Sequence, residues 1–456
     1  MAISVEHVYR GLGGLAYRLL TLFEHGVKKP VFGCQMCGQC ALSKTGLVCP
    51  MRCPKTLRNG SCGGPVNGRC EVYPDRPCVW VEIYESSSRL GWTDRLQAVQ
   101  WPVNWSLQGT SSWINFLTKK DRPPAHARLG QPRLIASRAS PSELVAGSNL
   151  ERVLRAGEFA VTSELGPPKS ASATAVQRKA ALLRGYVDAV NVTDNQRAVV
   201  HLSSLAGSIL ALQEGVEPVY QLTARDRNRI ALQSDLLGAS SLGVRNVLLL
   251  TGDHQRHGNH PEAKGVFDLD STQMALTARR MRDEGLLLSG DSLKTKPRLF
   301  IGVAAHPGLE PLELELLRLE KKIDAGADFV QTQGVFDLER FERWMAAVRQ
   351  RGLHQRAFIL AGVLLIRSTR AAEVMKREVP GLYLPDSIYR CIVAAPDPEQ
   401  EGLKLGIELV QALRQVEGVR GVHLMAIGWE EAIPHVVEGA GLLPRPRLLE
   451  GVERAA

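Results

Sequence analysis

Residues 298–336 read RLFIGVAAHPGLEPLELELLRLEKKIDAGADFVQTQGVF, and this stretch decides the fold. Two short apolar runs, 298–305 and 327–333, have the composition of buried strands. Between them, leucines recur at the spacing of a helix with one apolar face. A strand, a helix and a second strand in this order predict two parallel strands joined by a crossover helix.

The same alternation fills the C-terminal two thirds of the chain. We predict eight strands, at 158–165, 187–193, 217–223, 245–251, 298–305, 327–333, 357–365 and 419–427. Eight such units in about 300 residues are typical of a (β/α)8 TIM barrel. A doubly wound open sheet is disfavoured because the first strand–helix junction, 164–169, lacks the glycine fingerprint of nucleotide-binding folds.

The predicted fold class is therefore α/β, a TIM barrel preceded by a small cysteine-rich metal-binding domain. We place the cysteine-rich module at 1–120, a linker at 121–145 and the barrel at 146–456. We expect the module and the barrel to have separate cores. Apolar residues from Val5 to Phe23 fall on one stripe of a helix, which we expect to pack in a core or dock to a partner.

Composition and charge narrow the class of protein. Of the 456 residues, 44% are hydrophobic and 23% charged, as in soluble globular proteins, and no bilayer span or secretory signal is evident. We therefore expect a cytoplasmic protein. Residues 1–150 hold 18 basic and 9 acidic side chains and the rest holds 38 of each, so the net charge of +9 is N-terminal. No basic run is interleaved with aromatics, which favours an acidic partner or a solvated face over nucleic acid.

Polar residues gather where the predicted strands end, and the active site of a barrel is built from those ends. The candidates are Glu164, Thr193, Asp194, Gln221, Thr223, Asp253, His306, Gln331 and Gln333. Any one of them could be a helix cap, but six of the eight strands end in such groups. Two carboxylates in one cavity, Glu164 and Asp253, can be held at different pKa values, so that one is an acid and the other stays ionised.

Eight of the nine cysteines fall within 45 residues, which indicates metal binding before disulfides. They are Cys34, Cys37, Cys40, Cys49, Cys53, Cys62, Cys70 and Cys78. Three cysteines at C-x2-C-x2-C spacing and two Cys-Pro pairs favour iron–sulfur, with thiolates enough for two [4Fe–4S] clusters. Zinc held by the pairs 34/37 and 49/53 is the alternative.

An ordered series of motifs runs through residues 158–446. It comprises Glu164 with Pro167-Pro168-Lys169, Leu222-Thr223, Thr251-Gly252-Asp253, Val303-Ala304-Ala305-His306-Pro307, the helix 316–328, Gln331-Thr332-Gln333 with Phe336-Asp337, and Gly421-Val422-His423. In this order the motifs resemble the methylenetetrahydrofolate reductase family. The resemblance implies a flavoenzyme that reduces 5,10-methylenetetrahydrofolate to 5-methyltetrahydrofolate.

The resemblance also implies residue roles. Glu164 would be the general acid that protonates N10 of the folate, while Asp253, Gln333 and Gln331 would bind the substrate. The flavin, FAD in preference to FMN, would be held by Thr193, Gln221, Thr223, Gly252, Asp253, His306, Lys321 and Lys322. The sequence departs from the usual family residues at Gln221, Thr251, His306 and Gly428-Trp429. Flavin type and electron donor, NAD(P)H or an electron-donor protein, therefore stay open, and we expect an oligomer.

The cysteine segment is itself similar to a known module. From Cys34 to Cys62 it resembles the cysteine-rich partner subunit found beside the reductase in acetogens, a family described as the reductase C-terminal domain, although here it is N-terminal. That resemblance implies electron delivery to the flavin site or structural support of it. The alternative function is a non-redox folate or methyl-carrier binding protein with structural zinc that serves a methyltransferase partner. Bound flavin would distinguish the two.

Overall fold

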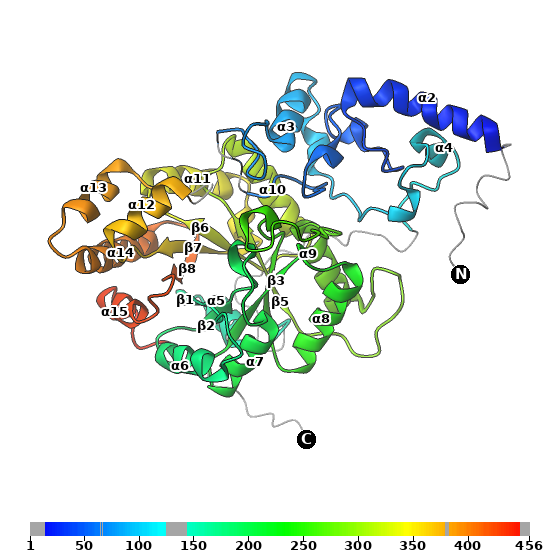
Figure 1. Cartoon of the computed structure of the whole chain (residues 1–456). Coiled ribbons are helices and arrows are strands. Elements are labelled where there is room, and N and C mark those ends of the chain that lie inside the picture. Colours follow the sequence, from blue (N-terminus) through cyan, green and yellow to red (C-terminus); the bar gives the residue numbers. More distant parts are fainter. Residues whose placement is uncertain (1–13, 64, 66, 125–143, 379–382, 447–456) are drawn as a thin grey trace.

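The computed structural model describes residues 14–446 except 64, 66, 125–143 and 379–382. Most of the expected linker, and residues 5–13 of the expected first helix, lie outside these described residues. The rest forms an eight-stranded barrel with an irregular, cysteine-rich module to one side (Figure 1).

The barrel confirms the predicted fold class, because all eight expected strands are present and all neighbours pair in parallel. They close in chain order as β1 (Ala160–Leu165), β2 (Ala189–Val192), β3 (Pro218–Thr223), β4 (Asn246–Leu250), β5 (Phe300–Ala305), β6 (Phe329–Gly334), β7 (Phe358–Leu364) and β8 (Val419–Met425). Parallel strands need crossover connections, and helices supply them.

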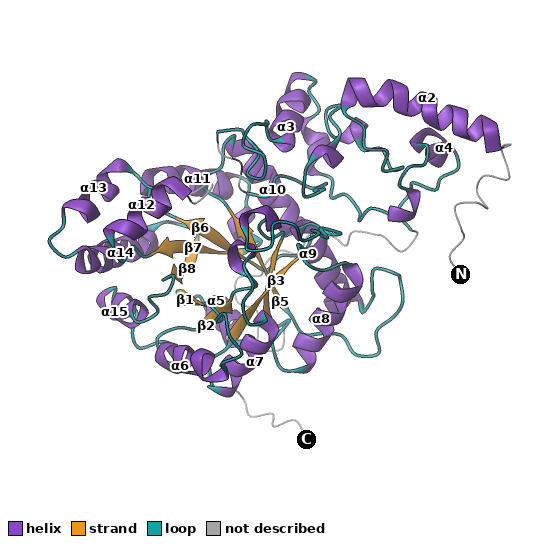
Figure 2. Ribbon diagram, in the orientation of Figure 1, coloured by secondary structure: helices purple, strands orange, loops and turns teal. Residues whose placement is uncertain are grey.

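Helices surround the strands (Figure 2). They are α5 (Asn149–Arg155), α6 (Ala173–Leu183), α7 (Ser204–Gln213), α8 (Arg229–Ser241), α9 (Ser271–Arg279), α10 (Leu312–Asp324), α11 (Leu338–Gln350), α12 (Thr369–Glu378), α13 (Asp386–Ala394), α14 (Pro398–Gln415) and α15 (Ala432–Gly439). The short α5 packs Leu150 and Leu154 against the first residues of the strands and Phe300 inside the barrel. That end of the barrel is therefore filled by apolar side chains, and the ligand cavity lies at the opposite end.

The cysteine-rich module has few regular elements. It contains α2 (Gly14–Phe32), α3 (Val79–Arg89) and α4 (Ser112–Leu117), joined by loops that carry the cysteines. Where residues 5–23 predict a helix, the described part runs from 14 to 32, nine residues beyond the expected end. No helix within the described residues is long and apolar enough to cross a membrane.

The module and the barrel each have a cluster of their own but also share one apolar cluster, so their cores are not as fully separate as expected. Trp80 and Ile83 of α3 pack with Leu314 and Leu317 of α10, all at most 5% exposed. The reason is that α10 has two apolar sides, one toward the strands and one toward the module. The module is thereby fixed over the wall of the barrel that α10 forms.

Polar bonds continue this seam. The amide of Asn59 donates to Asp270 Oδ2 at 2.8 Å, and the backbone N–H of Arg58 donates to the same atom at 3.3 Å. Lys55 Nζ donates to the carbonyl oxygen of Gly252 at 2.9 Å, at the end of β4. Residues 55–59 of the module therefore touch the loops that build the barrel's active-site end.

Candidate active site and cysteine cavities

The C-terminal ends of the strands surround an open space, called here the barrel cavity. Its volume of about 460 Å³ lies within the about 300–1,000 Å³ of an ordinary small-molecule site. Its walls come from the barrel strands and also from Lys55, Cys62, Gly63 and Glu71 of the module. The module therefore completes one side of the cavity.

Ten of the twelve predicted non-cysteine residues line this cavity. They are Glu164, Asp194, Gln221, Thr223, Gly252, Asp253, His306, Lys322, Gln331 and Gln333. The other two do not, since Thr193 Oγ1 donates to Gln196 at 2.8 Å and Lys321 Nζ donates to the carbonyl oxygen of Asn59 at 3.3 Å. Lys321 also lies over the Trp80 ring, 5.6 Å from its centroid. The structure therefore places Lys321 in the seam with the module.

A buried polar network lies beneath Glu164, and of its members the sequence had assigned only Gln331 to the site. His423 Nε2 is 3.8 Å from Glu164 Oε1, and its Nδ1 is 3.0 Å from Thr162 Oγ1. The amide nitrogen of Gln331 donates to Thr162 Oγ1 at 3.1 Å, and its oxygen accepts from Asn191 at 2.6 Å. Because all of these groups are partnered, the network fixes the ring of His423 and, through it, one side of Glu164.

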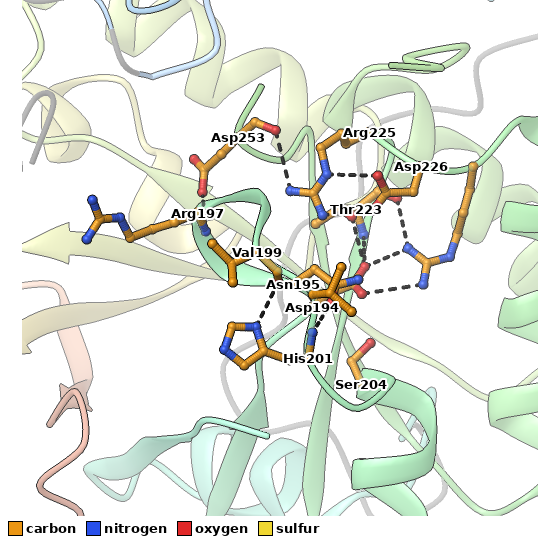
Figure 3. Close-up of polar contacts among 12 residues, drawn as sticks. Asp194, Asn195, Arg197, Val199, His201, Ser204, Thr223, Arg225, Asp226 and Asp253 are labelled. Carbon is orange, nitrogen blue, oxygen red and sulfur yellow. Dashed lines mark hydrogen bonds and ion pairs between the residues drawn. The ribbon is translucent and has the colours of Figure 1, made fainter. Parts of the chain in front are cut away.

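The loops after β2, β3 and β4 are tied together by carboxylates (Figure 3). Asp194 accepts from the backbone N–H and the hydroxyl of Thr223, at 2.9 and 2.8 Å, and from Arg227 at 2.6 Å. Asp253 Oδ2 accepts from the backbone N–H of Arg197 at 2.8 Å. The Asp253 carboxylate is thus oriented by the loop after β2, from a different strand.

That loop is held in an uncommon backbone conformation. Asn195, Arg197 and Ala198 have φ values of 48°, 57° and 56°. Such conformations cost of order 1 kcal/mol each and are concentrated at ligand sites. The bond from Arg197 N–H to Asp253 contributes to the contacts that hold the loop.

Positive charge lines one wall of the barrel cavity. Burial, and next the adjacent Arg318, lower the pKa of Lys322 to about 7, while its Nζ donates to the carbonyl oxygen of Ala304 at 2.7 Å. Arg318 pairs with buried Glu315 at 2.6 Å, and Glu315 also accepts from the backbone N–H of His306 at 2.6 Å. A buried lysine that is readily neutral gains most from an anionic ligand, so this wall suits a phosphate or carboxylate.

The eight clustered cysteines divide into two cavities of four. Cys34, Cys37, Cys40 and Cys49 line a space of about 390 Å³, called here the outer cavity. Burial is the largest cause that raises the pKa of Cys34 and Cys49, and neighbouring thiols of the same four add to it. The C-x2-C-x2-C run therefore meets the first Cys-Pro cysteine.

Cys53, Cys62, Cys70 and Cys78 line the second space, of about 330 Å³, called here the inner cavity. Burial raises the pKa of Cys53 to about 12. Cys62, Lys55 and Glu71 line both the inner cavity and the barrel cavity. The inner cavity therefore adjoins the barrel cavity directly. This division separates Cys49 from Cys53, which the zinc alternative had placed in one site.

The donor set of each cysteine cavity fits a soft metal. Among the described residues, no three His, Cys, Asp or Glu side chains converge closely enough to hold an ion as they stand. Metal binding would therefore require the thiols to turn toward the centre of their cavity. All eight are free, each set has four, and buried Lys28 and Lys55 beside them would offset thiolate charge.

A closed parallel barrel with charged and polar strand ends around one open cavity defines an enzyme-type TIM barrel. A family model described as "Methylenetetrahydrofolate reductase" matches residues 149–441. One described as "Methylene-tetrahydrofolate reductase C terminal" matches residues 17–106. Since the first match covers more than half of the chain, the chain belongs to the methylenetetrahydrofolate reductase family, and the predicted fusion of the two modules is confirmed.

Relatives agree with this membership at low identity. The chain is similar to methylenetetrahydrofolate reductase 1 of Schizosaccharomyces pombe, 25% identical over 50% of this chain and 36% of that protein. A probable methylenetetrahydrofolate reductase (NADPH) of Caenorhabditis elegans is 28% identical over 54% of this chain and 36% of that protein. The 5,10-methylenetetrahydrofolate reductase of Salmonella typhimurium is 22% identical over 63% of this chain and 93% of that protein. The chain thus spans little more than a third of those two eukaryotic relatives.

Proposed function

We propose that this chain reduces 5,10-methylenetetrahydrofolate to 5-methyltetrahydrofolate at the barrel cavity. The observation that carries the proposal is the pair Glu164 and Asp253 in one cavity of a chain that belongs to this family. In the reaction the bond between the methylene carbon and N10 breaks, N10 gains a proton and the carbon gains a hydride. Two electrons and two protons are consumed in each turnover.

Glu164 is the proton donor in this proposal. A carboxylic acid can protonate N10 as the bond to carbon opens, and a positioned general acid of this kind contributes about 10²–10⁴-fold. His423, 3.8 Å away, holds the carboxyl from below and can pass a proton to it after each turnover. The Asp253 carboxylate stabilises the positive charge that develops on the pterin.

The donor set of the barrel cavity fits a flavin. Gln221 offers an amide to a ring rich in carbonyls and ring nitrogens, and Lys322 lies on the cationic wall for a phosphate. When bound and reduced, a flavin supplies the hydride that the methylene carbon requires.

The cysteine cavities are proposed as two [4Fe–4S] sites in series. The first is formed by the four thiols of the outer cavity and the second by those of the inner cavity. Because Cys62 lines both the inner cavity and the barrel cavity, electrons from a donor protein would enter at the outer site and leave beside the flavin. Nothing in this route requires a nicotinamide donor in the barrel.

The test is anaerobic purification of the full chain, with flavin, iron, sulfide and zinc quantified together and turnover of methylenetetrahydrofolate measured with reduced methyl viologen. We expect one flavin and eight irons per chain, and formation of methyltetrahydrofolate. A protein with flavin and activity but with zinc and no iron would reject the electron route and retain the reductase. A flavin-free, inactive protein that binds folate would instead support the methyl-carrier alternative.

A further inference from the structure

The helix α2 buries Tyr17 and the charged Glu24 and Lys28, whereas most of its apolar side chains are exposed. Glu24 and Lys28 are buried and paired at 2.8 Å, and Glu24 also accepts from Ser111 and Ser112 of the α4 segment. Around the rest of the helix the exposed side chains include Leu15, Leu19, Leu20, Leu22, Phe23, Val27 and Val31. A helix that exposes apolar side chains to water has a surface that a partner could bury.

The short helix α4 extends this surface. Trp113, Phe116 and Leu117 are exposed, and the Phe23 and Trp113 rings lie 6.3 Å apart between centroids. Figure 1 shows α2 and α4 together at the end of the module that is remote from the strands. We call these ten side chains of α2 and α4 the apolar face. Ten exposed apolar side chains on two helices in contact are more than the scattered single exposures of an ordinary surface and mark an interaction site.

The charges around the apolar face are basic. Exposed Arg18 and Lys29 lie on α2, and exposed Lys119, Lys120 and Arg122 follow α4. In the described segments 14–32 and 105–124 the carboxylates are Glu24, which is buried and paired, and Asp121, which is half-buried. An apolar centre with a cationic rim is complementary to an acidic protein, whereas two copies of this face would bring like charges together.

The apolar face is continuous with the outer cavity. Lys28 Nζ lies 4.9 Å from the Trp113 ring centroid and 3.8 Å from Cys40 Sγ. Cys40 is itself exposed, and Glu24 and Ser112 line the same cavity. A protein bound on α2 and α4 would therefore sit directly against the thiol edge of the outer site.

We propose that the apolar face is the docking surface for an acidic one-electron carrier protein, an inference that rests on the proposed electron route through the cysteine cavities. Each docking oxidises the carrier by one electron, and two dockings supply the two electrons that reduction of one methylene group consumes. The apolar centre provides adhesion, while the rim of lysines and arginines steers and orients the carrier. The face thus determines which reductant reaches the flavin.

The experiment uses the full chain with both metal sites loaded. One variant combines Leu22→Gln with Phe116→Gln, and a second combines Lys119→Glu with Lys120→Glu. The matched controls are Ile230→Gln, which alters an equally exposed apolar residue of α8, and Arg414→Glu, which alters an exposed cation of α14. The probes are a strongly acidic bacterial ferredoxin, reduced photochemically, and reduced methyl viologen, which is too small to need a docking surface.

We expect the bimolecular rate of reduction by the ferredoxin to fall at least tenfold in both face variants, and the wild-type rate to fall steeply with salt. The rate with methyl viologen should stay within twofold of wild type in every variant. The two control variants should match wild type with both reductants.

Other results would overturn the docking surface. They are equal ferredoxin rates in wild type and face variants, a dimer that Leu22→Gln/Phe116→Gln converts to monomers, or binding to anionic vesicles that the same variants abolish without a change in ferredoxin rate. Calorimetric titration with the ferredoxin separates this inference from the proposed function. A chain that binds it through this face but accepts no electrons, even from methyl viologen, retains the surface and rejects the electron route.

Discussion

Among the residues of the barrel cavity, Glu164 has the most specific assigned task. Only the folate half-reaction needs a proton at N10, so Glu164→Gln should leave flavin reduction unchanged and slow methyltetrahydrofolate formation by about 10²–10⁴-fold. Stopped-flow measurement of the two half-reactions separates these effects. The same loss in both half-reactions would show that Glu164 supports the flavin site and is not the acid.

The lowered pKa of Lys322 leads to a prediction of how the stability of the protein depends on pH. Its pKa is lowered from 10.5 to about 7 by burial, so between those values the unfolded chain binds a proton that the folded chain has lost. Because of this residue, the free energy of unfolding of the flavin-free protein increases as pH rises from 7 toward 10. Below pH 7 the buried lysine is charged, and its full penalty, of the order of a few kcal/mol, lowers the stability of the folded chain.

Lys322→Met removes that penalty while keeping the apolar stem. We expect the variant to melt at a higher temperature than wild type at pH 6, with the difference reduced at pH 9, when both are flavin-free. Lys404→Met, at an exposed lysine of α14, is the control and should show no such difference. A stabilisation that grows with pH would contradict the assignment. Bound flavin should also shrink the difference, because its phosphate compensates the lysine charge.

At the same scale, the sequence misplaced Lys321 and overlooked His423, and each error has a physical reason. Lys321 and Lys322 are neighbours on one helix, and periodicity alone does not reveal that α10 faces the module on the side of Lys321. His423 lies in the middle of β8, where a polar side chain is ordinarily interpreted as a core residue whose hydrogen bonds are made within the protein. The signal that could have found it is Thr162, two residues before Glu164 on β1, because alternate residues of a strand point to the same side.

At the scale of elements, the strands were predictable because each depends on a local apolar run between turn residues, and all eight were found within two residues of their expected ends. The sequence could not predict which cysteines line each cavity, since this depends on how irregular loops cross. Cys49 and Cys53 are separated by a single short turn, Pro50–Arg52, yet they line different cavities. The sequence named all eight cysteines as candidate ligands and grouped Cys34, Cys37 and Cys40 by spacing, but only the folded loops show which cavity each of the other five lines.

This division predicts the metal content of two variants. Cys37→Ser removes a ligand of the outer cavity and should lose about half of the iron, with flavin reduction by methyl viologen retained. Cys62→Ser removes a ligand of the inner cavity, should lose the other half, and should also perturb the flavin spectrum because Cys62 lines the barrel cavity. Iron analysis and low-temperature electron paramagnetic resonance of both variants give the answer. If either substitution empties both sites, the eight thiols form one metal centre.

At the scale of the whole molecule, the shared cluster of α3 and α10 makes the module part of the folded barrel. Trp80 is 2% exposed, packs on Leu314 and Leu317, and donates its indole N–H to the carbonyl oxygen of Leu57 at 3.1 Å. Lys321 lies over its ring. The residues that bind the module to the barrel therefore also position the loop that carries Lys55 into the active site.

We expect the two parts to unfold together for this reason. Calorimetry of the wild-type chain should give one transition, with flavin release and loss of cluster absorbance at the same temperature. Trp80→Ala, which should cost about 3–5 kcal/mol by deleting a buried ring, should lower both signals together. Trp92→Ala removes a half-buried indole that stacks on Arg95, 3.9 Å from the ring centroid, and should shift neither by more than a degree or two. Two separate transitions, of which only the module's moves in Trp80→Ala, would show that the barrel keeps its fold and its flavin without the module.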